Sequence, residues 1–373
     1  MALSAPGDAV EETRRYRIAV VGGAGWWGRY YLRAAARHPR CELVALVDSS
    51  RERRAPFAEH YRVRAVYDRL EELLRRETPD IVIACLPVSA TPDAVVACAE
   101  AGVRAVQCEK PMAESLVQAD RMIDACRARG VPFGCGTALY ELPHLEEICR
   151  LAQNGIIGEL RDAAIPQGFR DQASGLGCVP LCMLQFVTGR SVEWVEGWTL
   201  PDEAAMGDDD CQAYGTLGLQ GGLRCTVVSP TEVKHPETQV SLVGSEGRIW
   251  LAPPEPLTVR GLGADSGPVP RKRQEGEAAE QGPGFLDGAF GWVIDGLIAA
   301  IEGGGEPACS ARAYRHALEV AVALKVSARQ GHRRVPLPLV DRTPRMRPIA
   351  YRWLGGDVTG WGILGGTPPE VLD

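Results

Sequence analysis

Positive charge is scarce in this chain, and lysine is its scarcest source. Basic residues number 41 against 48 acidic ones, which gives a formal net charge of −7, and only four of the basic residues are lysines. Nucleic acids and acidic membrane surfaces are bound through clustered basic side chains, which this composition does not supply. We therefore expect a small molecule as the partner, and neither a nucleic acid nor a membrane.

Signals for metal binding, disulfides and export are also missing. The twelve cysteines include no CxxC pair, and the six histidines show neither HxxxH nor HExxH spacing. The first residues, MALSAPGDAVEETRRYR, contain no apolar signal region, and no apolar run approaches the ~20 residues that a membrane span needs. We expect a cytoplasmic protein with reduced cysteines and no metal site.

The order of the apolar runs predicts two domains, because 373 residues exceed one ordinary hydrophobic core. Strand patterns such as RIAVV first alternate with helix patterns, which predicts βαβ crossovers and a doubly wound parallel sheet of the Rossmann type. Later strand patterns have few helices between them and favour an α+β domain on an open, largely antiparallel sheet. The predicted divisions are 1–137, with a polar arm over 1–15, then 138–340, and an irregular tail over 341–373.

A glycine motif follows the first predicted strand. In VVGGAGWWGRYY, the residues Gly23, Gly25 and Gly28 match GxGxxG, and Asp48 ends the next strand twenty residues beyond Gly28. A strand before the motif and a helix after it are the context of a dinucleotide-binding loop. The glycines allow a tight turn, close approach to a pyrophosphate and close packing of helix on strand. The helix N-terminus offers free N–H groups to the phosphates.

Asp48 bears on which dinucleotide is bound. At the end of the second strand it is placed to accept hydrogen bonds from the adenosine ribose and to repel a 2′-phosphate, which favours NAD. The alternative is that Asp48 only caps the helix that begins near Arg51. Ser49, Ser50 and Arg51 offer hydrogen bonds and charge to a 2′-phosphate, so NADP stays open as the cofactor.

Trp26 and Trp27 are unusual residues within such a loop. They are candidates for direct contact with the cofactor. Packing of these large rings against the second domain, or against a neighbouring subunit, is the alternative interpretation.

Lys110 in VQCEKPM is the main candidate for catalysis. A chain with 37 arginines is expected to use arginine where a bare charge is enough, so a lysine indicates an amine that gains and loses a proton. Glu109, Lys110 and Pro111 end a strand at the carboxyl edge of the sheet, where a cis proline would aim the preceding side chain into the crevice. There Glu109 and Lys110 can contact the cofactor, and the amine can stabilise an alkoxide or pass a proton. A Glu–Lys surface pair is the alternative.

These motifs resemble the Gfo/Idh/MocA family of NAD(P)-dependent oxidoreductases, which includes glucose-fructose oxidoreductase and inositol dehydrogenase. The resemblance covers Arg17 to Leu339. It implies that Lys110 touches both substrate and nicotinamide, that Leu86 and Pro87 border the cofactor, and that the open sheet forms the substrate pocket and the oligomer interface. The segments that carry it, in the order the family shows, are VVGGAGWWG, ACLPVSATPDAVVACAEAGVRAVQCEKPMAES, GIIGEL, FVTGR, VSLVGSEGRIWL and RHALEVAVALKVSARQGHRRVPLPL.

The chain departs from this family at its usual proton-transfer residues. Members that oxidise sugars and polyols usually carry an Asp, a His and a further Asp ahead of the TGR segment, and here Gly175, Val179 and Cys182 stand at those places. Thr91 replaces the family's His in the loop after the fourth strand. Hydride transfer to a carbonyl or imine still needs a proton source.

Lys110, Tyr140, Asp171 and water are the candidate proton sources. Tyr140 lies where the family's chain crosses between its domains, and packing at that junction is the alternative. Asp171 lies in the irregular loop GFRDQASG, from which it can reach the pocket.

The missing Asp and His also bear on the substrate. A pocket lined by Leu176, Cys178 and Val179 is expected to be less polar than a sugar site, which predicts a substrate with fewer hydroxyls or with hydroxyls bound elsewhere.

These observations predict an NAD(P)-dependent oxidoreductase that transfers hydride between a nicotinamide and a small ketone or alcohol. A modified sugar and a secondary-metabolite intermediate are the candidate substrates, and Lys110 is expected to assist with proton and charge. Two alternatives stay open. One is a thiazoline or cyclic imine reductase of natural-product biosynthesis, with a carrier protein as partner, and the other is a protein that binds NAD(P) without redox turnover. Because an open sheet face needs covering, we expect a homodimer or homotetramer.

Overall fold

Short strands rich in Val, Ile and Ala form the first sheet of the computed structural model. The structure describes residues 14–136, 143–166, 168–169, 172–175, 177–229, 239–251, 258–261, 284–348 and 371–372. The strands of the first sheet all run parallel in the order β3-β2-β1-β4-β5-β6. The order reverses between β1 and β4, where open sheets of this kind bind ligands at the carboxyl ends of the strands. The predicted doubly wound sheet is confirmed. The strands are β1 (Tyr16–Val21), β2 (Cys41–Val47), β3 (Ala65–Tyr67), β4 (Ile81–Ala84), β5 (Ala105–Cys108) and β6 (Phe133–Cys135).

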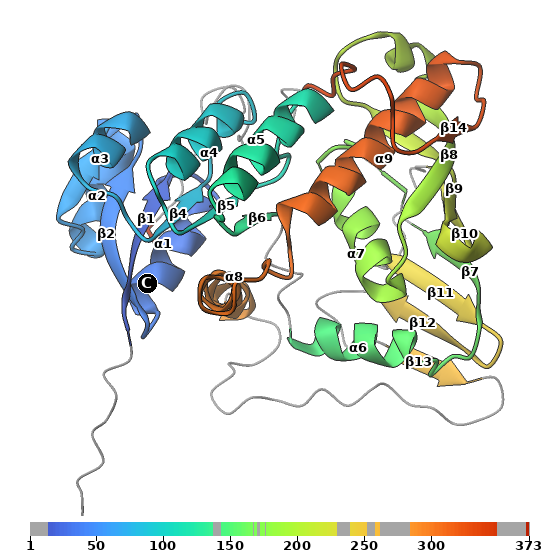
Figure 1. Cartoon of the computed structure of the whole chain (residues 1–373), viewed down its shortest axis with the longest axis horizontal. Coiled ribbons are helices and arrows are strands. Elements are labelled where there is room, and N and C mark those ends of the chain that lie inside the picture. Colours follow the sequence, from blue (N-terminus) through green and yellow to red (C-terminus); the bar gives the residue numbers. More distant parts are fainter. Residues whose placement is uncertain are drawn as a thin grey trace, which may run out of the picture.

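Helices connect these strands and cover both faces of the sheet (Figure 1). The central strands β1, β4 and β5 are almost wholly buried, as expected when a parallel sheet has helices on each side. Ser50 caps α2 and Ser115 caps α5, each accepting a hydrogen bond from the backbone N–H three residues on. The helices are α1 (Gly28–Arg37), α2 (Arg51–His60), α3 (Leu70–Arg76), α4 (Thr91–Glu100) and α5 (Leu116–Ala128).

A second, mixed sheet follows in the order β13-β12-β11-β7-β10-β9-β8-β14. Its neighbouring strands are antiparallel except for β7 and β10, which are parallel. The predicted open, largely antiparallel sheet is therefore confirmed. The strands are β7 (Leu160–Ile165), β8 (Val192–Leu200), β9 (Gln212–Leu219), β10 (Arg224–Val227), β11 (Val240–Gly244), β12 (Gly247–Leu251), β13 (Thr258–Gly261) and β14 (Val335–Pro336).

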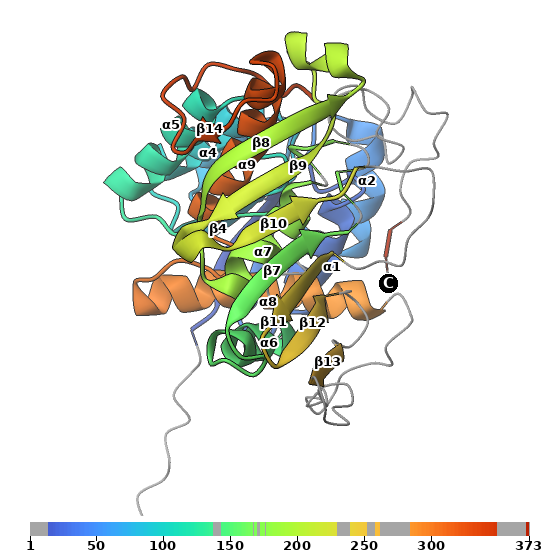
Figure 2. The same cartoon turned by 90° about the vertical axis from the view of Figure 1, so that its right-hand side faces the viewer.

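Helices cover only one face of the second sheet, and the other face is turned to the viewer in Figure 2. Side chains alternate accordingly, so that Cys225 and Val227 of β10 are buried whereas Thr226 is exposed. None of the helices in the described ranges is long and apolar enough to cross a membrane. The helices of this half are α6 (Pro143–Gln153), α7 (Cys178–Thr188), α8 (Gly284–Gly303) and α9 (Ala311–Arg329), with short 3-10 turns η2 (Asp202–Met206) and η3 (Gln220–Gly222).

Helix α8 comes late in the sequence but packs beside α1 and β5 of the first sheet (Figure 1). Polar contacts fix it there: His38 Nε2 lies 3.0 Å from Asp295 Oδ1, and the hydroxyl of Tyr16 donates to Glu302 over 2.9 Å. Arg40 also pairs with Glu302. Helix α9 joins the two halves by packing, because it lies against β8 and β9 of the second sheet and beside α5 and β6 of the first half.

A buried carboxylate, Asp210, organises the approach to α7. It lies just before β9 and accepts hydrogen bonds from the backbone N–H groups of Ala173 (3.0 Å), Ser174 (3.1 Å) and Cys211 (2.8 Å) and from the Ser174 hydroxyl (2.5 Å). On the other side of the segment, the hydroxyl of Tyr314 in α9 donates to the Ser174 carbonyl over 2.8 Å. These bonds fix the residues that lead into α7, and therefore the direction of its first turn.

Asp210 gives the stability of the fold a pH dependence of defined sign. Burial raises the pKa of this carboxyl from 3.8 to about 6, although its hydrogen-bond donors oppose the rise. Because the folded-state pKa lies above the unfolded one, the native state binds the proton more tightly, and this contribution to the free energy of unfolding is lost as pH rises through that window.

We expect the unfolding free energy of the wild type, minus that of Asp210→Asn, to fall by up to about 3 kcal/mol between pH 4 and pH 6. Urea titrations of both proteins at several pH values measure this difference. A difference that stays constant with pH would show that Asp210 does not titrate in this window.

Candidate functional site

The glycine loop turns sharply between β1 and α1. Gly22 adopts a φ of +72°, and a Cβ atom there would lie 2.1 Å from the carbonyl oxygen of Cys85. A Cβ on Gly28 would lie 2.2 Å from the Gly22 oxygen, so glycine is needed for α1 to approach the end of β1. Around Gly25, by contrast, the single described atom within 4 Å of such a Cβ would be the Gly22 oxygen at 3.1 Å. The loop is therefore open at Gly25, where the motif expects a pyrophosphate.

The start of α1 suits an anion. Its N-cap residue, Trp27, makes no side-chain capping hydrogen bond, and the first turn contains no acidic residue. The first N–H groups of a helix have no partner within the helix and carry partial positive charge. The residues present thus fit a dinucleotide, whose phosphates would be held by the loop and by this helix end.

Asp48 ends β2 and is buried, with its side chain 4% exposed. Its Oδ1 accepts a hydrogen bond from the Ser50 N–H (3.0 Å) and pairs with Arg53 (3.1 Å). Ser50 provides the cap of α2, so Asp48 supports the turn before that helix. Because both contacts use Oδ1, Oδ2 is the oxygen that a ribose hydroxyl would meet.

Arg53, which pairs with Asp48, was not among the residues predicted from the sequence. Ser49 and Arg51, the residues expected to hold a 2′-phosphate, are exposed beside Asp48, but the ion pair with the acid comes from Arg53, one turn into α2. Ser50 could have indicated this contact. It is a typical N-cap residue, and the third residue after an N-cap, here Arg53, lies close to the turn before the helix.

Trp27 packs against the second half of the chain. Its ring lies 6.2 Å from that of Phe290 in α8 and 5.9 Å from that of Tyr30, while Trp26 lies under the guanidinium of Arg29 at 4.0 Å. For Trp27 this is the packing on the second half of the chain that was the alternative to cofactor contact. The ring of Trp27 also approaches the Lys110 amine, with Nζ 6.0 Å from its centroid. Contact of either Trp with the cofactor stays a prediction.

Lys110 follows β5 at the carboxyl edge of the sheet, and the Lys110–Pro111 peptide bond is cis, as predicted. Glu109 is fixed by two hydrogen bonds: its N–H donates to Ala84 of β4 (3.2 Å), and its carboxylate accepts from the hydroxyl of Tyr31 (2.9 Å). Both Glu109 and Lys110 are half-buried. A freely solvated surface pair, the alternative interpretation of the motif, does not describe this arrangement.

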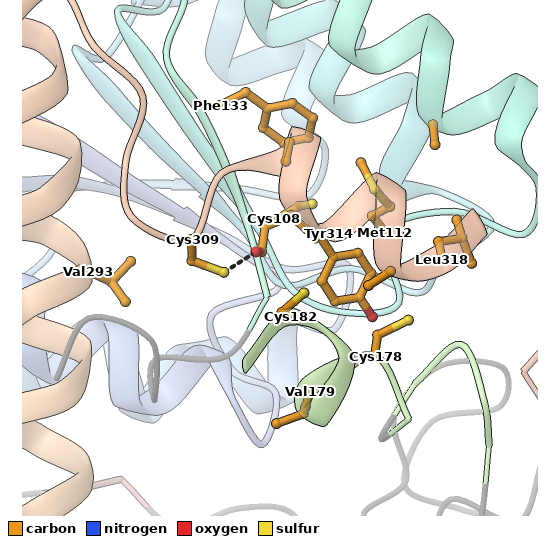
Figure 3. Close-up of a cluster of buried hydrophobic side chains, with 14 of the residues drawn as sticks. Cys108, Met112, Phe133, Cys178, Val179, Cys182, Val293, Cys309, Tyr314 and Leu318 are labelled. Carbon is orange, nitrogen blue, oxygen red and sulfur yellow. Dashed lines mark hydrogen bonds between the residues drawn. The ribbon is translucent and has the colours of Figure 1, made fainter. Parts of the chain in front are cut away.

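Thiols and apolar groups of α7 face this edge of the sheet. Figure 3 shows Cys178, Val179 and Cys182 in one buried cluster with Cys108 and Tyr314. Burial raises the pKa of the Cys178 thiol well above its ordinary value, and the nearby charge of Lys110 opposes that rise. The Cys178 thiol is therefore neutral near pH 7. Gly175, Val179 and Cys182, which stand at the expected Asp and His positions, provide neither a carboxylate nor an imidazole.

Thr91 stands at the position of the missing histidine after β4 but cannot take over its proton transfer. Its buried hydroxyl donates to the carbonyl oxygen of Pro87 (3.1 Å) and lies 3.4 Å from that of Leu86. The hydroxyl therefore closes the turn that begins α4. Leu86 is half-buried and Pro87 is exposed at the end of β4. They lie on the same edge of the sheet as the glycine loop, which is compatible with their predicted place beside a cofactor.

Two of the three predicted catalytic residues, Tyr140 and Asp171, lie outside the described residues, as does Leu176. Lys110 is the catalytic candidate that the structure places. Within the described part of the chain, no group of three or more His, Cys, Asp or Glu side chains is arranged to hold a metal ion.

Comparisons with known proteins agree with this geometry. Residues 16–137 match the GFO_IDH_MocA family model, described as an oxidoreductase family with an NAD-binding Rossmann fold. D-apiose dehydrogenase from Paraburkholderia graminis is 25% identical over 342 residues, which cover 85% of this chain and 89% of that protein. Myo-inositol 2-dehydrogenase from Thermotoga maritima is 27% identical over 224 residues, covering 56% and 67%.

Solved structures share the whole fold. An aldose-aldose oxidoreductase from Caulobacter crescentus, complexed with glycerol, superposes with a TM-score of 0.71 at 22% identity, covering 87% of this chain and 100% of that one. An oxidoreductase from Agrobacterium radiobacter, in complex with NAD+, L-tartaric acid and magnesium, gives a TM-score of 0.70 at 18% identity, covering 86% and 98%.

Asp48→Asn tests the predicted preference for NAD. The amide oxygen can still accept from the Ser50 N–H, so the change removes the charge and frees Arg53 while keeping the turn. We expect the ratio of NADPH affinity to NADH affinity to rise about tenfold, because a 2′-phosphate no longer meets a buried carboxylate. Fluorescence titration with each dinucleotide measures the ratio, and an unchanged ratio would contradict this role of Asp48.

Proposed function

Because the chain belongs to the Gfo/Idh/MocA family of NAD-binding oxidoreductases, we propose that it transfers hydride between a nicotinamide and a sugar-like ketone or the corresponding alcohol. The observation that carries the proposal is the position of Lys110. Its amine lies at the carboxyl edge of β5, 6.0 Å from the ring centroid of Trp27 in the glycine loop, and its charge acts on the thiol of Cys178 in α7. It is thus placed near both the loop that would hold the cofactor and the half of the chain that would hold the substrate.

The proposed reaction balances with one amine. A reduced nicotinamide, when bound by the glycine loop, would provide the hydride for the carbonyl carbon. The Lys110 ammonium donates a hydrogen bond to the carbonyl oxygen and transfers its proton as negative charge develops there. The neutral amine then takes a proton from water. In the direction of alcohol oxidation, the neutral amine accepts the hydroxyl proton instead.

The relatives support a sugar-like substrate. Those named above act, by their names, on D-apiose and myo-inositol, and a further relative is D-xylose 1-dehydrogenase from Haloarcula marismortui, 24% identical over 64% of this chain. Cys178, Val179 and Cys182 are buried. Their thiols and apolar groups cannot replace the hydrogen bonds that a carboxylate and an imidazole would make to substrate hydroxyls. We therefore propose a substrate whose hydroxyls are held by other parts of the site or are fewer than in a simple aldose.

We also propose that the uncovered face of the second sheet is buried between copies of the chain. Large aromatic side chains lie on this face: Trp198 stacks on Tyr214 with ring centroids 5.8 Å apart, and Trp194 lies under Arg334 at 3.8 Å. A broad half-apolar sheet surface of this kind favours burial in an isologous dimer.

Lys110→Met and Lys110→Arg test the proposed role of the amine. Methionine keeps the volume without a proton or charge, and arginine keeps the charge but does not release a proton. With any substrate that the wild type turns over, we expect kcat to fall at least 100-fold in the Met variant and at least tenfold in the Arg variant. NADH affinity should change by less than about threefold in both, because phosphates and ribose supply most of the contacts.

The assay follows oxidation of NADH and NADPH with keto-sugars, simple ketones and cyclic imines, and reduction of NAD+ with D-apiose, D-xylose and myo-inositol. Full turnover by Lys110→Met would contradict the proposed role, and Tyr140→Phe and Asp171→Asn would then identify the proton donor. Turnover of imines alone would favour the cyclic imine reductase. Cofactor binding without turnover of any compound would favour a protein that does not perform redox chemistry.

Thr226→Arg tests self-association through the sheet. Thr226 is exposed in the middle of the uncovered face, so an arginine there leaves the isolated chain unstrained but places like charges opposite each other in a dimer. We expect the wild type to sediment as a multiple of 40.2 kDa and the variant as a monomer with an unchanged melting temperature. A monomeric wild type would contradict the proposal.

A further inference from the structure

A buried tyrosine connects the glycine-loop helix to the strand end that carries Lys110. Tyr31 belongs to α1 and has no exposed surface. Its hydroxyl donates to the carboxylate of Glu109 over 2.9 Å. Glu109 is the residue immediately before Lys110, so the two side chains leave α-carbons only ~3.8 Å apart.

The ring of Tyr31 is held in place by aromatic packing. It meets the ring of Phe290 edge-on, with centroids 4.5 Å apart and an interplanar angle of 85°. Phe290 also stacks on Tyr30 at 5.3 Å and 9°, and lies beside Trp27 at 6.2 Å. We call Trp27, Tyr30, Tyr31 and Phe290 the aromatic quartet. It joins the glycine loop, α1 and α8 into one packed unit.

The quartet approaches two adjacent residues of the segment 109–111, which we call the EKP segment. Tyr31 contacts Glu109, and Trp27 lies under the amine of Lys110 with Nζ 6.0 Å from the ring centroid. Trp27 and Tyr31 are four residues apart at the start of α1, so they lie on the same side of the helix. Packing alone explains an aromatic ring at position 31, but it does not explain a buried hydroxyl, which is costly unless it has a partner.

The Tyr31 hydroxyl is the donor in this contact, and the Glu109 carboxylate is the acceptor. A hydrogen bond from a neutral donor to a carboxylate is stronger than one between neutral groups. Burial, with the Glu109 charge, raises the pKa of the Tyr31 hydroxyl well above its ordinary value, so this group stays a proton donor. Burial likewise raises the pKa of the neighbouring thiols of Cys85 and Cys135 well above the ordinary value, and they remain neutral.

We propose that Tyr31 is a positioning residue for Lys110. Its hydroxyl holds the Glu109 carboxylate and partly compensates the negative charge of the residue next to Lys110. The aromatic quartet fixes the end of β5 from which Lys110 extends. Without the hydroxyl, the carboxylate is less compensated and acts more strongly on the neighbouring ammonium. The amine then holds its proton more tightly and is drawn toward Glu109. This inference rests on the proposed function for its relevance to catalysis, but its physical content is measurable without a substrate.

The scarcity of lysine makes the test direct. Reductive methylation with 13C-formaldehyde labels the four lysines and the amino terminus, which gives a methyl NMR spectrum of few signals. Lys110→Arg identifies the Lys110 signal, and its titration with pH gives the pKa of that amine. The variants are Tyr31→Phe, which removes one oxygen, and Tyr30→Phe, the matched control, which removes a hydroxyl from the same quartet.

We expect Tyr31→Phe to raise the Lys110 pKa by at least about half a unit, and Tyr30→Phe to leave it unchanged. Glu109→Gln removes the carboxylate itself and should lower the same pKa, so the two changes have opposite signs. With a substrate in hand, the pH–rate profile of Tyr31→Phe should move with its Lys110 pKa. An unchanged Lys110 titration in Tyr31→Phe would overturn the proposal and leave Tyr31 a packing residue. If Tyr31→Phe does not fold, an unchanged Lys110 pKa in Glu109→Gln would overturn the proposal instead.

This result is separable from the proposed function. If Lys110→Met retains full turnover while Tyr31→Phe shifts the Lys110 titration, the catalytic role fails and the positioning contact stands. If Lys110→Met abolishes turnover while Tyr31→Phe leaves the titration unchanged, the catalytic role stands and the positioning contact fails.

Discussion

The carboxyl edge of a parallel sheet, at the place where its strand order reverses, is the constraint on which this structure depends. The glycine loop after β1, the turn after β4 and the EKP segment after β5 all reach that edge because parallel strands end on the same side. A lysine placed there is close to any dinucleotide that the loop holds. From the second half of the chain, α8 packs beside α1 and β5, and α9 packs beside α5 and β6.

Much of this arrangement could be predicted because it is local. The alternation of strands with helices, the GxGxxG spacing and the position of Asp48 depend on the pleat, the turn and the helix start, all of which a few neighbouring residues determine. The same holds for the end of β5, where Pro111 stops the strand. The open second sheet followed from strand patterns without helices between them.

The contacts that hold the site together could not be predicted, because they join distant segments. Phe290 lies 259 residues after Tyr31 in the chain, yet the two rings are in contact, and Asp210 fixes a segment some 36 residues earlier. Apolar periodicity shows that α8 is buried, but not which domain it packs on. Arg53 was overlooked beside Asp48 for a related reason: the more exposed Ser49 and Arg51 are nearer in sequence, whereas the helical turn brings Arg53 back.

Helix α7 contains neither an Asp nor a His, and this bears most directly on the source of the proton. Cys178, Val179 and Cys182 are buried, and burial raises the pKa of the Cys178 thiol well above its ordinary value, so we expect proton transfer to involve groups elsewhere. Lys110 is the described residue that we propose for it. The ring of Trp27 lies near its amine, and Tyr31 holds the neighbouring Glu109 through a hydrogen bond. Because lysine is so scarce in this chain, a lysine at this position favours a role for an amine rather than for a permanent cation.

A crystal structure with NAD+ bound would show directly whether Lys110 meets the reacting atoms. We expect Lys110 Nζ to face C4 of the nicotinamide across a gap that admits one carbonyl group, with the carbon to be reduced ~3–3.5 Å from C4. This expectation would be contradicted by an amine that points into bulk water, or by side chains of the protein filling the space between Nζ and C4.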